Sequence, residues 1–322
     1  MWDICVVIPT RNEEKSIDGI LRSVKAAITQ NFCKSLRIIV VDDSTDQTRT
    51  LARNAGAEVL NGGGRGLGSA MYDGLKAAVA TKPDYILSLD GDGQADVDEI
   101  PRFLKPLIED RADLVVGSRF LEQHLVQYRY RFVNRFGTIV LAWILRRLTS
   151  LKLTDSHGGL RAMRREVAEE LEMLGTHTYV QETIIDAVEK GFRILEMPST
   201  WKVRQHGKSR VVSSIPRYIF YSLPVLILRS GQHIRLLYSG GIIMIVFALI
   251  YFFTILAEAR FNIKALGDRV PAFVWITLMI SIGFQCFFFG FVLQLIKQIK
   301  YRLDRTVVSR RRTDYNSRPG DR

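Results

Sequence analysis

Two aspartates, Asp90 and Asp92, directly follow an apolar run at residues 85–89 that is typical of a buried strand. On an extended backbone this spacing puts both carboxylates on one face. Carboxylate oxygens suit Mg²⁺ or Mn²⁺, and these ions keep open positions for water or phosphate oxygens. The pair therefore predicts a divalent cation site, with a solvated turn as the alternative. We expect the glycines Gly91 and Gly93 to keep the backbone open to a ligand.

The flanking chain alternates short apolar strands with segments of helical periodicity. Strands are expected near residues 5–9, 36–41, 58–60, 85–89, 112–118 and 192–198, and helices near 16–29, 46–55, 69–80 and 179–191. This alternation predicts an α/β fold with a mostly parallel central sheet, which binds ligands beyond the carboxyl ends of its strands. Polar or glycine-rich segments stand at those ends, at residues 10–14, 42–46, 62–68 and 90–94.

The glycine-rich segment 62–68 has neither the GxGxxG order of dinucleotide-binding folds nor the GxxxxGK[ST] order of a P-loop. Those two classes of nucleotide site are therefore excluded. The segment either wraps the phosphate or sugar of another ligand or forms a plain turn.

Four of these segments together resemble a known family. They are VIPTRNEE at residues 7–14, VDDSTD at 41–46, the loop around Gly66 and DGDGQ at 90–94. Their order and spacing are similar to those of family 2 glycosyltransferases with a GT-A fold, and in particular to the dolichyl- or polyprenyl-phosphate hexose synthases, a group that contains dolichol-phosphate mannose synthase. The likeness covers about residues 4–210.

The resemblance implies roles for residues at the strand ends. The donor nucleotide would be held by Pro9, Thr10, Asn12, Glu13, Asp42, Gly66 and Asp90, and the metal ion, Mg²⁺ or Mn²⁺, by Asp92 and Gln94. Gly91 stands where the family more often has alanine, which we expect to leave the chemistry unchanged.

Basic residues further along would hold the phosphates. By the same resemblance, Arg119 borders the acceptor loop, and the segment from Arg204 to Arg210 is similar to the family's Arg-x-x-Gly-x-Ser segment. Residues expected to bind acceptor or diphosphate are Arg119, Arg129, Arg131, Arg135, Arg204, Lys208 and Ser209. The arginines at 129–135 alternate with aromatic residues, so they either clamp a lipid phosphate or form a solvated basic loop. For the segment from Arg204 to Arg210, the alternative is a basic loop that lies near anionic lipid headgroups.

The segment DSHGGLR at residues 155–161 matches a family motif near the reaction centre. Asp155 is expected to act either as a base or as the partner of an arginine. A phosphomonoester acceptor hardly needs a base, because its second pKa is near ~6. We expect His157 to be incidental. Glu182 is expected either to face the site or to have a surface or a capping role. The catalytic candidates are Asp92, Asp155 and Arg119.

The chain beyond residue 210 is expected to associate with a membrane. Residues 211–235, broken by Pro216 and Pro224, predict interfacial amphipathic helices. Residues 236–257 and 272–296 carry no charge, and each exceeds the ~20 residues that cross a bilayer, so 236–296 predicts a transmembrane hairpin. Residues 139–145 are too short to span and form an interfacial or a core helix. Gln285 and Gln294 could link the two spans or support a homo-oligomer.

The tail, residues 297–322, carries nine Lys or Arg against three Asp. Positive charge on both outer flanks of the hairpin predicts that tail and catalytic domain are cytosolic. Disorder is expected from about Thr313. The net charge of +12 follows the membrane segments, which disfavours a nucleic-acid partner. Three widely spaced cysteines indicate a reducing compartment without structural zinc.

Together these features predict an inverting glycosyltransferase with its catalytic GT-A domain at residues 1–210. It would move a hexose, mannose from GDP-mannose as the first expectation, to dolichyl or polyprenyl phosphate at the cytosolic membrane face. UDP-glucose or another UDP-sugar is the alternative donor. A polysaccharide synthase is disfavoured because the Gln-x-x-Arg-Trp motif is absent. A non-catalytic, membrane-bound nucleotide-sugar-binding protein is the alternative of another class.

Overall fold

The computed structural model describes residues 1–28, 33–122, 124–127, 132–155, 157–173, 179–204, 232–258, 267 and 269–316. The chain forms two units, Met1–Arg229 and Ser230–Arg322. The expected boundary at residue 210 and most of the expected interfacial segment 211–235 lie outside the described residues.

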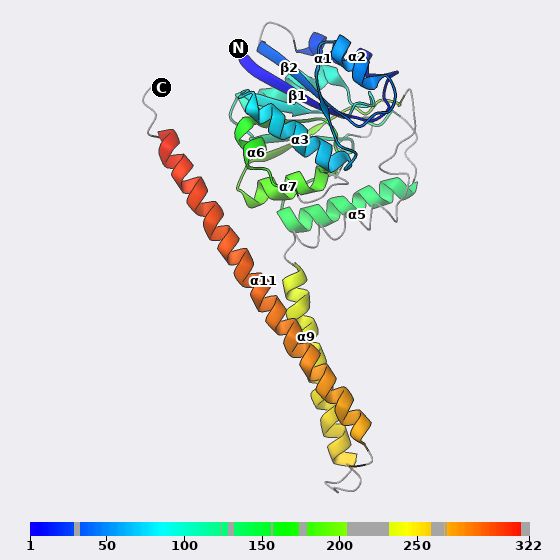
Figure 1. Cartoon of the computed structure of the whole chain (residues 1–322), viewed down its shortest axis with the longest axis vertical. Coiled ribbons are helices and arrows are strands. Elements are labelled where there is room, and N and C mark those ends of the chain that lie inside the picture. Colours follow the sequence, from blue (N-terminus) through cyan, green and yellow to red (C-terminus); the bar gives the residue numbers. More distant parts are fainter. Residues whose placement is uncertain are drawn as a thin grey trace. The chain divides into compact units, whose positions relative to one another are not determined.

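The N-terminal unit is built on one seven-stranded sheet, in which β1 and β2 are labelled in Figure 1. The strand order is β3-β2-β1-β4-β6-β5-β7. The strands are β1 Trp2–Thr10, β2 Cys33–Asp42, β3 Glu58–Asn61, β4 Tyr85–Ser88, β5 Leu114–Ser118, β6 Arg161–Arg164 and β7 Ile194–Pro198. β1 to β4 run parallel to one another, and β5 is parallel to β7. β6 is antiparallel to both of its neighbours, so the sheet is mixed but mostly parallel.

β6 is the strand that the sequence did not predict. Its four residues, RAMR, begin and end with arginine and show no apolar alternation. The first of these arginines, Arg161, is 1% exposed, and the groups that accept its hydrogen bonds lie inside the protein. Charge at the strand ends therefore hid an element that lies in the middle of the sheet.

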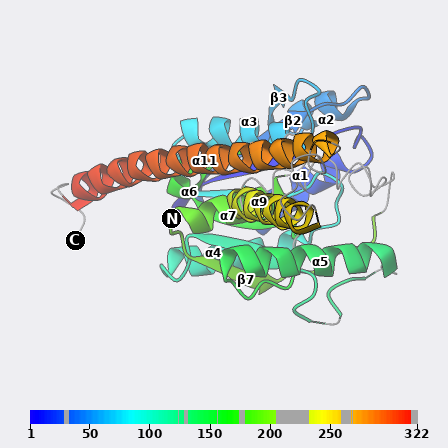
Figure 2. The ribbon, with the colours of Figure 1, turned by 90° about the horizontal axis from the view of Figure 1, so that it is seen from below.

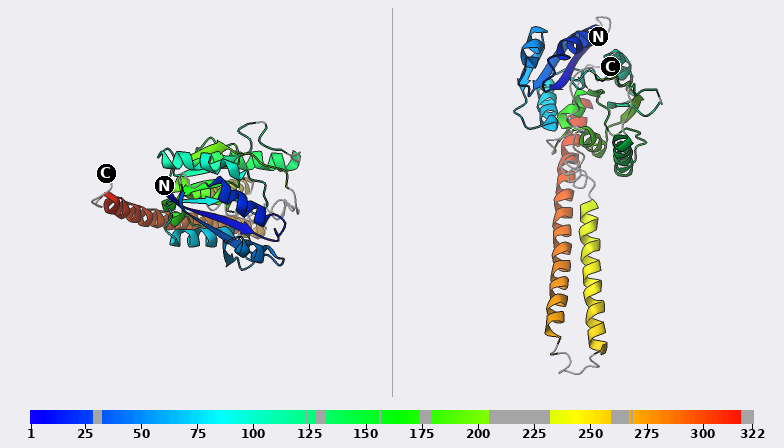
Figure 3. Two further views of the ribbon diagram at one scale, coloured as in Figure 1. Left: turned by 90° about the horizontal axis from the view of Figure 1, so that it is seen from above. Right: turned by 90° about the vertical axis from the view of Figure 1, so that its right-hand side faces the viewer.

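Helices cover both faces of the sheet (Figure 2, and Figure 3, left). They are α1 Ile17–Ala27, α2 Thr48–Asn54, α3 Leu67–Ala80, the short 3₁₀ helix η1 Val97–Glu99, α4 Ile100–Ile108, α5 Phe132–Thr149, α6 Arg165–Glu170 and α7 Val180–Glu189. The expected helix at 139–145 is therefore part of the longer α5.

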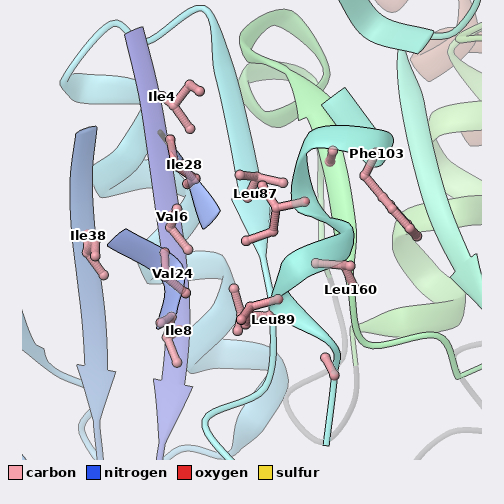
Figure 4. Packing of buried hydrophobic residues seen from close by; sticks show 14 of the residues in the cluster. Ile4, Val6, Ile8, Val24, Ile28, Ile38, Leu87, Leu89, Phe103 and Leu160 are labelled. Carbon is pink, nitrogen blue, oxygen red and sulfur yellow. The ribbon is translucent and has the colours of Figure 1, made fainter. Parts of the chain in front are cut away.

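Alternating side chains of the strands fill two cores. Ile4, Val6 and Ile8 of β1 pack with residues of α1, α2 and α4 on one face, as Figure 4 shows for ten labelled residues. Cys5 and Val7 point to the opposite face and pack with α3, α5, α6 and α7. The period of two along β1 places both cores around a sheet that is apolar on both sides. The loops at the strand ends are thus held on a rigid base.

The C-terminal unit contains α9, Gln232–Glu258, and α11, Val270–Asn316, which run side by side (Figure 3, right). Residues 234–258 and 270–299 are long and apolar enough to cross a membrane. The two helices approach closely where a Cβ on Gly241 would stand 2.7 Å from the Gly283 carbonyl oxygen. The Tyr238 hydroxyl also donates a 3.1 Å hydrogen bond to Gln294, one of the two glutamines expected to link the spans.

α11 continues well past the predicted end of the second span at residue 296. The structure shows helix to Asn316, where disorder was expected from about Thr313. Lys and Arg are good helix formers and are frequent from Lys297 onward, where only a few residues are β-branched. The helix therefore continues from the apolar segment into the charged one.

Candidate active site

Parallel pairing brings the polar segments of the N-terminal unit together. Thr10, the last residue of β1, pairs with Asp42, the last residue of β2, and Val7 of β1 pairs with Ser88 of β4. The carboxyl ends of three adjacent strands therefore meet at one edge, and Asp90 and Asp92 follow β4 at that edge.

Asp42 is fully buried, and its carboxylate binds side chains of the protein itself. Its carboxylate accepts hydrogen bonds from the hydroxyls of Thr10, at 2.8 Å, and Ser44, at 2.5 Å, and Arg49 Nε lies 3.3 Å away. Burial together with these donors means that the carboxylate ties the β1 and β2 loops to each other. Any contact of Asp42 with the donor nucleotide stays a prediction.

The segment after β1 is held in the same way. Asn12 adopts a positive φ of 54°, and its side-chain oxygen accepts the Thr45 N–H at 2.8 Å. Glu13 uses its backbone N–H to reach Thr48 Oγ1 at 2.9 Å. Asn12 is among the residues that tolerate the left-handed region, so it fixes this turn against the loop after β2.

The glycine-rich loop folds back on Asp43. The Asp43 carboxylate accepts the Gly64 N–H at 2.8 Å, and a Cβ on Gly62 would stand 2.7 Å from the same carboxylate. Gly66 has a φ of 107° and stands directly before α3. A side chain at Gly62 would require the Asp43 carboxylate to shift, and one at Gly66 would be strained by the backbone conformation.

Asp90 and Asp92 form a mutually repelling pair. Burial and the neighbouring Asp92 raise the pKa of Asp90 to about 7, although Arg161, Arg119 and Arg204 act in the opposite direction. Burial also raises the pKa of Asp92, and the Gln94 N–H and Arg204 only partly offset it. Two carboxylates held like this favour a further positive charge beside them.

Arg204 supplies one such charge beside Asp92. Its guanidinium makes an ion pair with Glu13, and its Nη1 lies 3.6 Å from Asp92 Oδ2. Gln94 is held through both its backbone and its side chain, because its carbonyl accepts the Lys202 N–H at 2.7 Å and its amide nitrogen lies 3.3 Å from the Lys202 carbonyl. Backbone pairing of the segments around Gln94 and Lys202 thus carries Arg204 to the aspartates.

Tight packing explains why residue 91 is a glycine. It is buried, and a Cβ there would stand 2.6 Å from Thr10 Cγ2 and 3.1 Å from the Pro9 carbonyl oxygen. The end of β1 therefore gives this position a packing reason for glycine, and the expectation that Gly91 keeps the backbone open to a ligand stays a prediction. An alanine at this position would require Thr10 to shift.

Asp155 and Arg119 form a buried ion pair. Oδ2 of Asp155 accepts Arg119 Nε at 2.6 Å, Oδ1 accepts Nη2 at 2.8 Å, and the Arg119 backbone N–H adds a third bond. Burial alone would raise the pKa of Asp155, but Arg119 outweighs it and holds that pKa below its ordinary value. The Arg119 guanidinium also lies 4.9 Å from the centre of the Trp201 ring. These contacts favour Asp155 as the partner of an arginine over Asp155 as a base.

The glycines of the 155–161 segment pass through a narrow space. A Cβ on Gly159 would stand 2.7 Å from Trp201 Cη2 and 2.9 Å from Asp90 Oδ2. Arg161 follows, and its buried guanidinium donates to the Gly158 and Val180 carbonyls at 3.2 and 2.9 Å. This packing sets the position of Asp90 from the side opposite β1.

Glu182 lies inside the protein, and His157 is half-buried. Burial first and the Arg119 guanidinium second lower the pKa of His157 to about 4, so the imidazole is neutral at physiological pH. Its backbone N–H donates to Asp155 at 2.8 Å. Glu182 in the first turn of α7 is 3% exposed, which excludes the expected surface role.

Only some of the predicted phosphate-binding residues can be placed in the structure. Arg129, Arg131, Lys208 and Ser209 fall outside the described residues. Arg135 lies in the first turn of α5 and is exposed.

The aspartate edge suits a hard cation. Its donors are carboxylate and amide oxygens, which Mg²⁺ and Mn²⁺ prefer. Among the described residues, no group of three or more His, Cys, Asp and Glu side chains is arranged for a metal ion. A cation at Asp92 would thus need oxygen ligands beyond the described His, Cys, Asp and Glu side chains, and the phosphates of a ligand could supply them.

Residues 5–172 match the model of glycosyl transferase family 2. The chain belongs to this family. A dolichyl-phosphate hexose transferase of Haloferax volcanii is 30% identical to this glycosyltransferase over 202 residues, which are 63% of this chain and 84% of the relative. A UDP-N-acetylglucosamine–dolichyl-phosphate N-acetylglucosaminyltransferase of Methanococcus voltae is 28% identical over 251 residues, 71% of this chain and 97% of the relative.

A solved structure shows the fold of this glycosyltransferase. Glucosyl-3-phosphoglycerate synthase from Mycobacterium tuberculosis, crystallised with Mn²⁺, UDP and glucosyl-3-phosphoglycerate, superposes with a TM-score of 0.54. The match covers 71% of this chain and 80% of that one at 22% identity. The predicted GT-A fold with its mostly parallel sheet is confirmed.

Four residues around the glycosyltransferase site were missed as functional candidates: Asp43, Arg49, Arg161 and Trp201. Asp43 and Arg161 stood within quoted motifs, so the paired aspartates and the terminal arginine were the available signals. Arg49 carried no signal because its contact with Asp42 forms only when the loop after β2 folds back, and Trp201 carried none because Arg119 is far from it in sequence.

Proposed function

We propose that this glycosyltransferase moves a hexose from a nucleotide-sugar to dolichyl or polyprenyl phosphate, with inversion at the anomeric carbon. The observation that carries the proposal is the Asp90–Asp92 pair, whose raised pKa values at the strand edge favour a bound cation and the diphosphate it would accompany. Support for the acceptor comes from relatives that are named as dolichyl-phosphate transferases.

Asp92 and Gln94 would hold the metal ion. Related folds crystallised with Mn²⁺ or Mg²⁺ support a divalent ion as the cofactor. When bound, such an ion would neutralise the charge that develops on the departing nucleoside diphosphate.

The chain's own residues would position the reactants. Arg204 already pairs with Glu13 beside Asp92, where it could also contact a diphosphate. Asp155 holds Arg119 against Trp201 and so fixes these two side chains on the side of the site opposite β1. The acceptor phosphate is itself the nucleophile, because it is ionised at neutral pH, and catalysis would depend on its orientation rather than on a protein base.

Two donors are candidates. GDP-mannose is the donor suggested by the resemblance to dolichol-phosphate mannose synthase. A UDP-sugar is the second candidate, favoured by the Methanococcus voltae relative, which is named for UDP-N-acetylglucosamine, and by the UDP bound in the related fold.

The two apolar helices would anchor the enzyme as a hairpin, and the arginines and lysines on its outer flanks would keep the catalytic unit and the tail cytosolic. A homo-oligomer through these helices remains part of the proposal, since their outer faces carry many exposed apolar side chains.

One experiment tests the reaction. The purified full chain is incubated with GDP- and UDP-linked sugars and with dolichyl or undecaprenyl phosphate, with and without EDTA. We expect lipid-linked sugar from one donor and its loss with EDTA. Binding of a nucleotide-sugar without product under any combination would instead support a non-catalytic binding protein.

A further inference from the structure

Glu196 of β7 binds the backbone of a turn that lies far from it in sequence. It stands opposite Val116 in the parallel pairing of β5 and β7. Both of its carboxylate oxygens accept the Thr154 N–H at 2.9 Å, and Oε1 also accepts the Asp155 N–H at 2.9 Å and the Thr154 hydroxyl at 3.2 Å. None of its partners among the described residues is a lysine or arginine. The carboxylate therefore serves the turn rather than a counter-charge.

The charge of Glu196 is itself unfavourable at this place. Burial raises the pKa of Glu196, and the N–H groups of Asp155 and Thr154 only partly offset that rise. The neighbouring Asp155 carboxylate raises the pKa further. A half-buried carboxylate beside another carboxylate costs free energy unless hydrogen bonds compensate for it. The hydrogen bonds to the turn are the compensation that the structure shows.

The turn leads directly to Arg119. Asp155, whose N–H Glu196 accepts, receives three hydrogen bonds from Arg119 through its own carboxylate. The Thr154 hydroxyl lies 2.6 Å from the hydroxyl of Ser118, the residue before Arg119. Glu196 thus holds the two residues that contact Arg119 and its neighbour, although it does not contact Arg119 itself.

We propose that Glu196 is a positioning residue for the acceptor side of the site. By holding the Thr154–Asp155 turn, it fixes the Arg119 guanidinium where that group would receive the phosphate of the lipid acceptor. The inference rests on the proposed function, which gives Arg119 this role. A guanidinium binds phosphate best when its planar fork is held in one orientation.

The charge of Glu196 and its positioning effect predict opposite results. An anion near a phosphate site repels the phosphate, so removal of Glu196 would strengthen phosphate binding if charge alone mattered. Loss of the turn's acceptor would instead release Asp155 and Arg119, and phosphate binding would weaken. The sign of the change therefore separates a positioning role from an electrostatic one.

Binding of a short prenyl phosphate tests the proposal without the transfer reaction. The full chain in detergent is titrated calorimetrically with citronellyl phosphate, and citronellol shows the part of the affinity that does not depend on phosphate. We expect Glu196→Ala to weaken phosphate-dependent binding at least ~10-fold, because the turn loses all of these hydrogen bonds. Glu196→Gln keeps one acceptor oxygen, so we expect a loss of roughly 2- to 5-fold.

Asp186→Asn is the matched control for a general loss of stability. Asp186 in α7 is 1% exposed and also accepts a backbone N–H, that of Glu172 at 2.9 Å, but it is outside the contacts that lead to Arg119. We expect its citronellyl phosphate affinity to equal that of the wild type. Hydrogen exchange of the Thr154 and Asp155 amides should accelerate in Glu196→Ala and not in Asp186→Asn.

Steady-state kinetics give a second readout. In the transfer assay, Glu196→Ala should raise KM for the lipid phosphate and leave KM for the nucleotide-sugar unchanged, because the turn is on the acceptor side. A merely structural role would lower the amount of active enzyme and leave both KM values unchanged.

Four results would overturn the inference. They are tighter binding of citronellyl phosphate by Glu196→Ala, equal binding by wild type and both Glu196 variants, an equal loss in Asp186→Asn, and wild-type binding that does not distinguish citronellyl phosphate from citronellol. If Glu196→Ala does not fold, Glu196→Gln decides, and unchanged or tighter binding contradicts the proposal. Absence of transfer with the expected order of affinities would instead refute the proposed reaction and leave the positioning role standing.

Discussion

Replacing Asp155 by asparagine should destabilise the protein without removing a catalytic base. The carboxylate is 2% exposed and receives three hydrogen bonds from Arg119, so the substitution leaves a buried guanidinium without its counter-charge. Breaking a buried pair costs about 3 to 5 kcal/mol, and asparagine keeps one acceptor oxygen, so we expect about 3 kcal/mol. For a unit of this size that lowers Tm by roughly 6 to 12 °C.

The assay is thermal unfolding of the full chain in detergent, followed by the pH dependence of kcat/KM at a temperature where the variant is folded. Asp110→Asn is the matched control, because Asp110 also pairs with arginines, Arg164 and Arg193, but at the surface. We expect little change in its Tm. The Asp155→Asn variant should keep the shape of the wild-type pH profile, because we propose that Asp155 pairs with Arg119 and does not exchange a proton in the reaction.

Two results would refute this reasoning. An unchanged Tm would mean that the Arg119–Asp155 pair does not hold the site together. Loss of the acidic limb of the pH profile, with Tm unaffected, would mean that Asp155 is the base.

Two further predictions concern the same segment. Gly159→Ala should lower kcat at least ~100-fold, because the new Cβ would displace Asp90 or Trp201, and displacements near 1 Å have that effect; Gly19→Ala, where a Cβ meets nothing within 4 Å, is the control, and equal transfer rates would contradict the packing. His157→Asn should flatten the loss of stability on acidification. The folded pKa of about 4 lies below the ordinary value near ~6.5, so stability is full above pH ~6.5 and is lost as pH falls toward 4. Denaturant midpoints at pH 7.5, 6 and 5 measure this, and parallel curves for variant and wild type would contradict it.

Much of the fold follows from local pattern. The apolar run near residues 5–9 predicts a strand, and β1 contains it, with alternate side chains of residues 4–8 in the two apolar cores. The spacing of Ile17, Leu21 and Val24 predicts α1, whose buried face they form. In both cases the side chains that define the period also make the contacts.

Elements with charged termini or long-range partners could not be predicted. β6 begins and ends with arginines that donate hydrogen bonds to the Val180 and Leu107 carbonyls of other segments, so its residues do not show an apolar alternation. The packing of Gly91 against Thr10 requires the β1–β4 pairing, which no local pattern contains. The hydrogen bonds that the Asp42 carboxylate accepts from Thr10, Ser44 and Arg49 likewise form only in the folded loops.

The central claim is that Asp92 holds a divalent cation together with the donor's diphosphate. Electron paramagnetic resonance of Mn²⁺, titrated into the full chain with UDP or GDP present, tests it most directly. Asp98→Asn is the matched control, because Asp98 is an exposed carboxylate in the same segment. We expect Asp92→Asn to weaken nucleotide-dependent Mn²⁺ binding at least tenfold and Asp98→Asn to leave it unchanged. Equal Mn²⁺ affinity in the Asp92→Asn variant and the wild type would contradict the account.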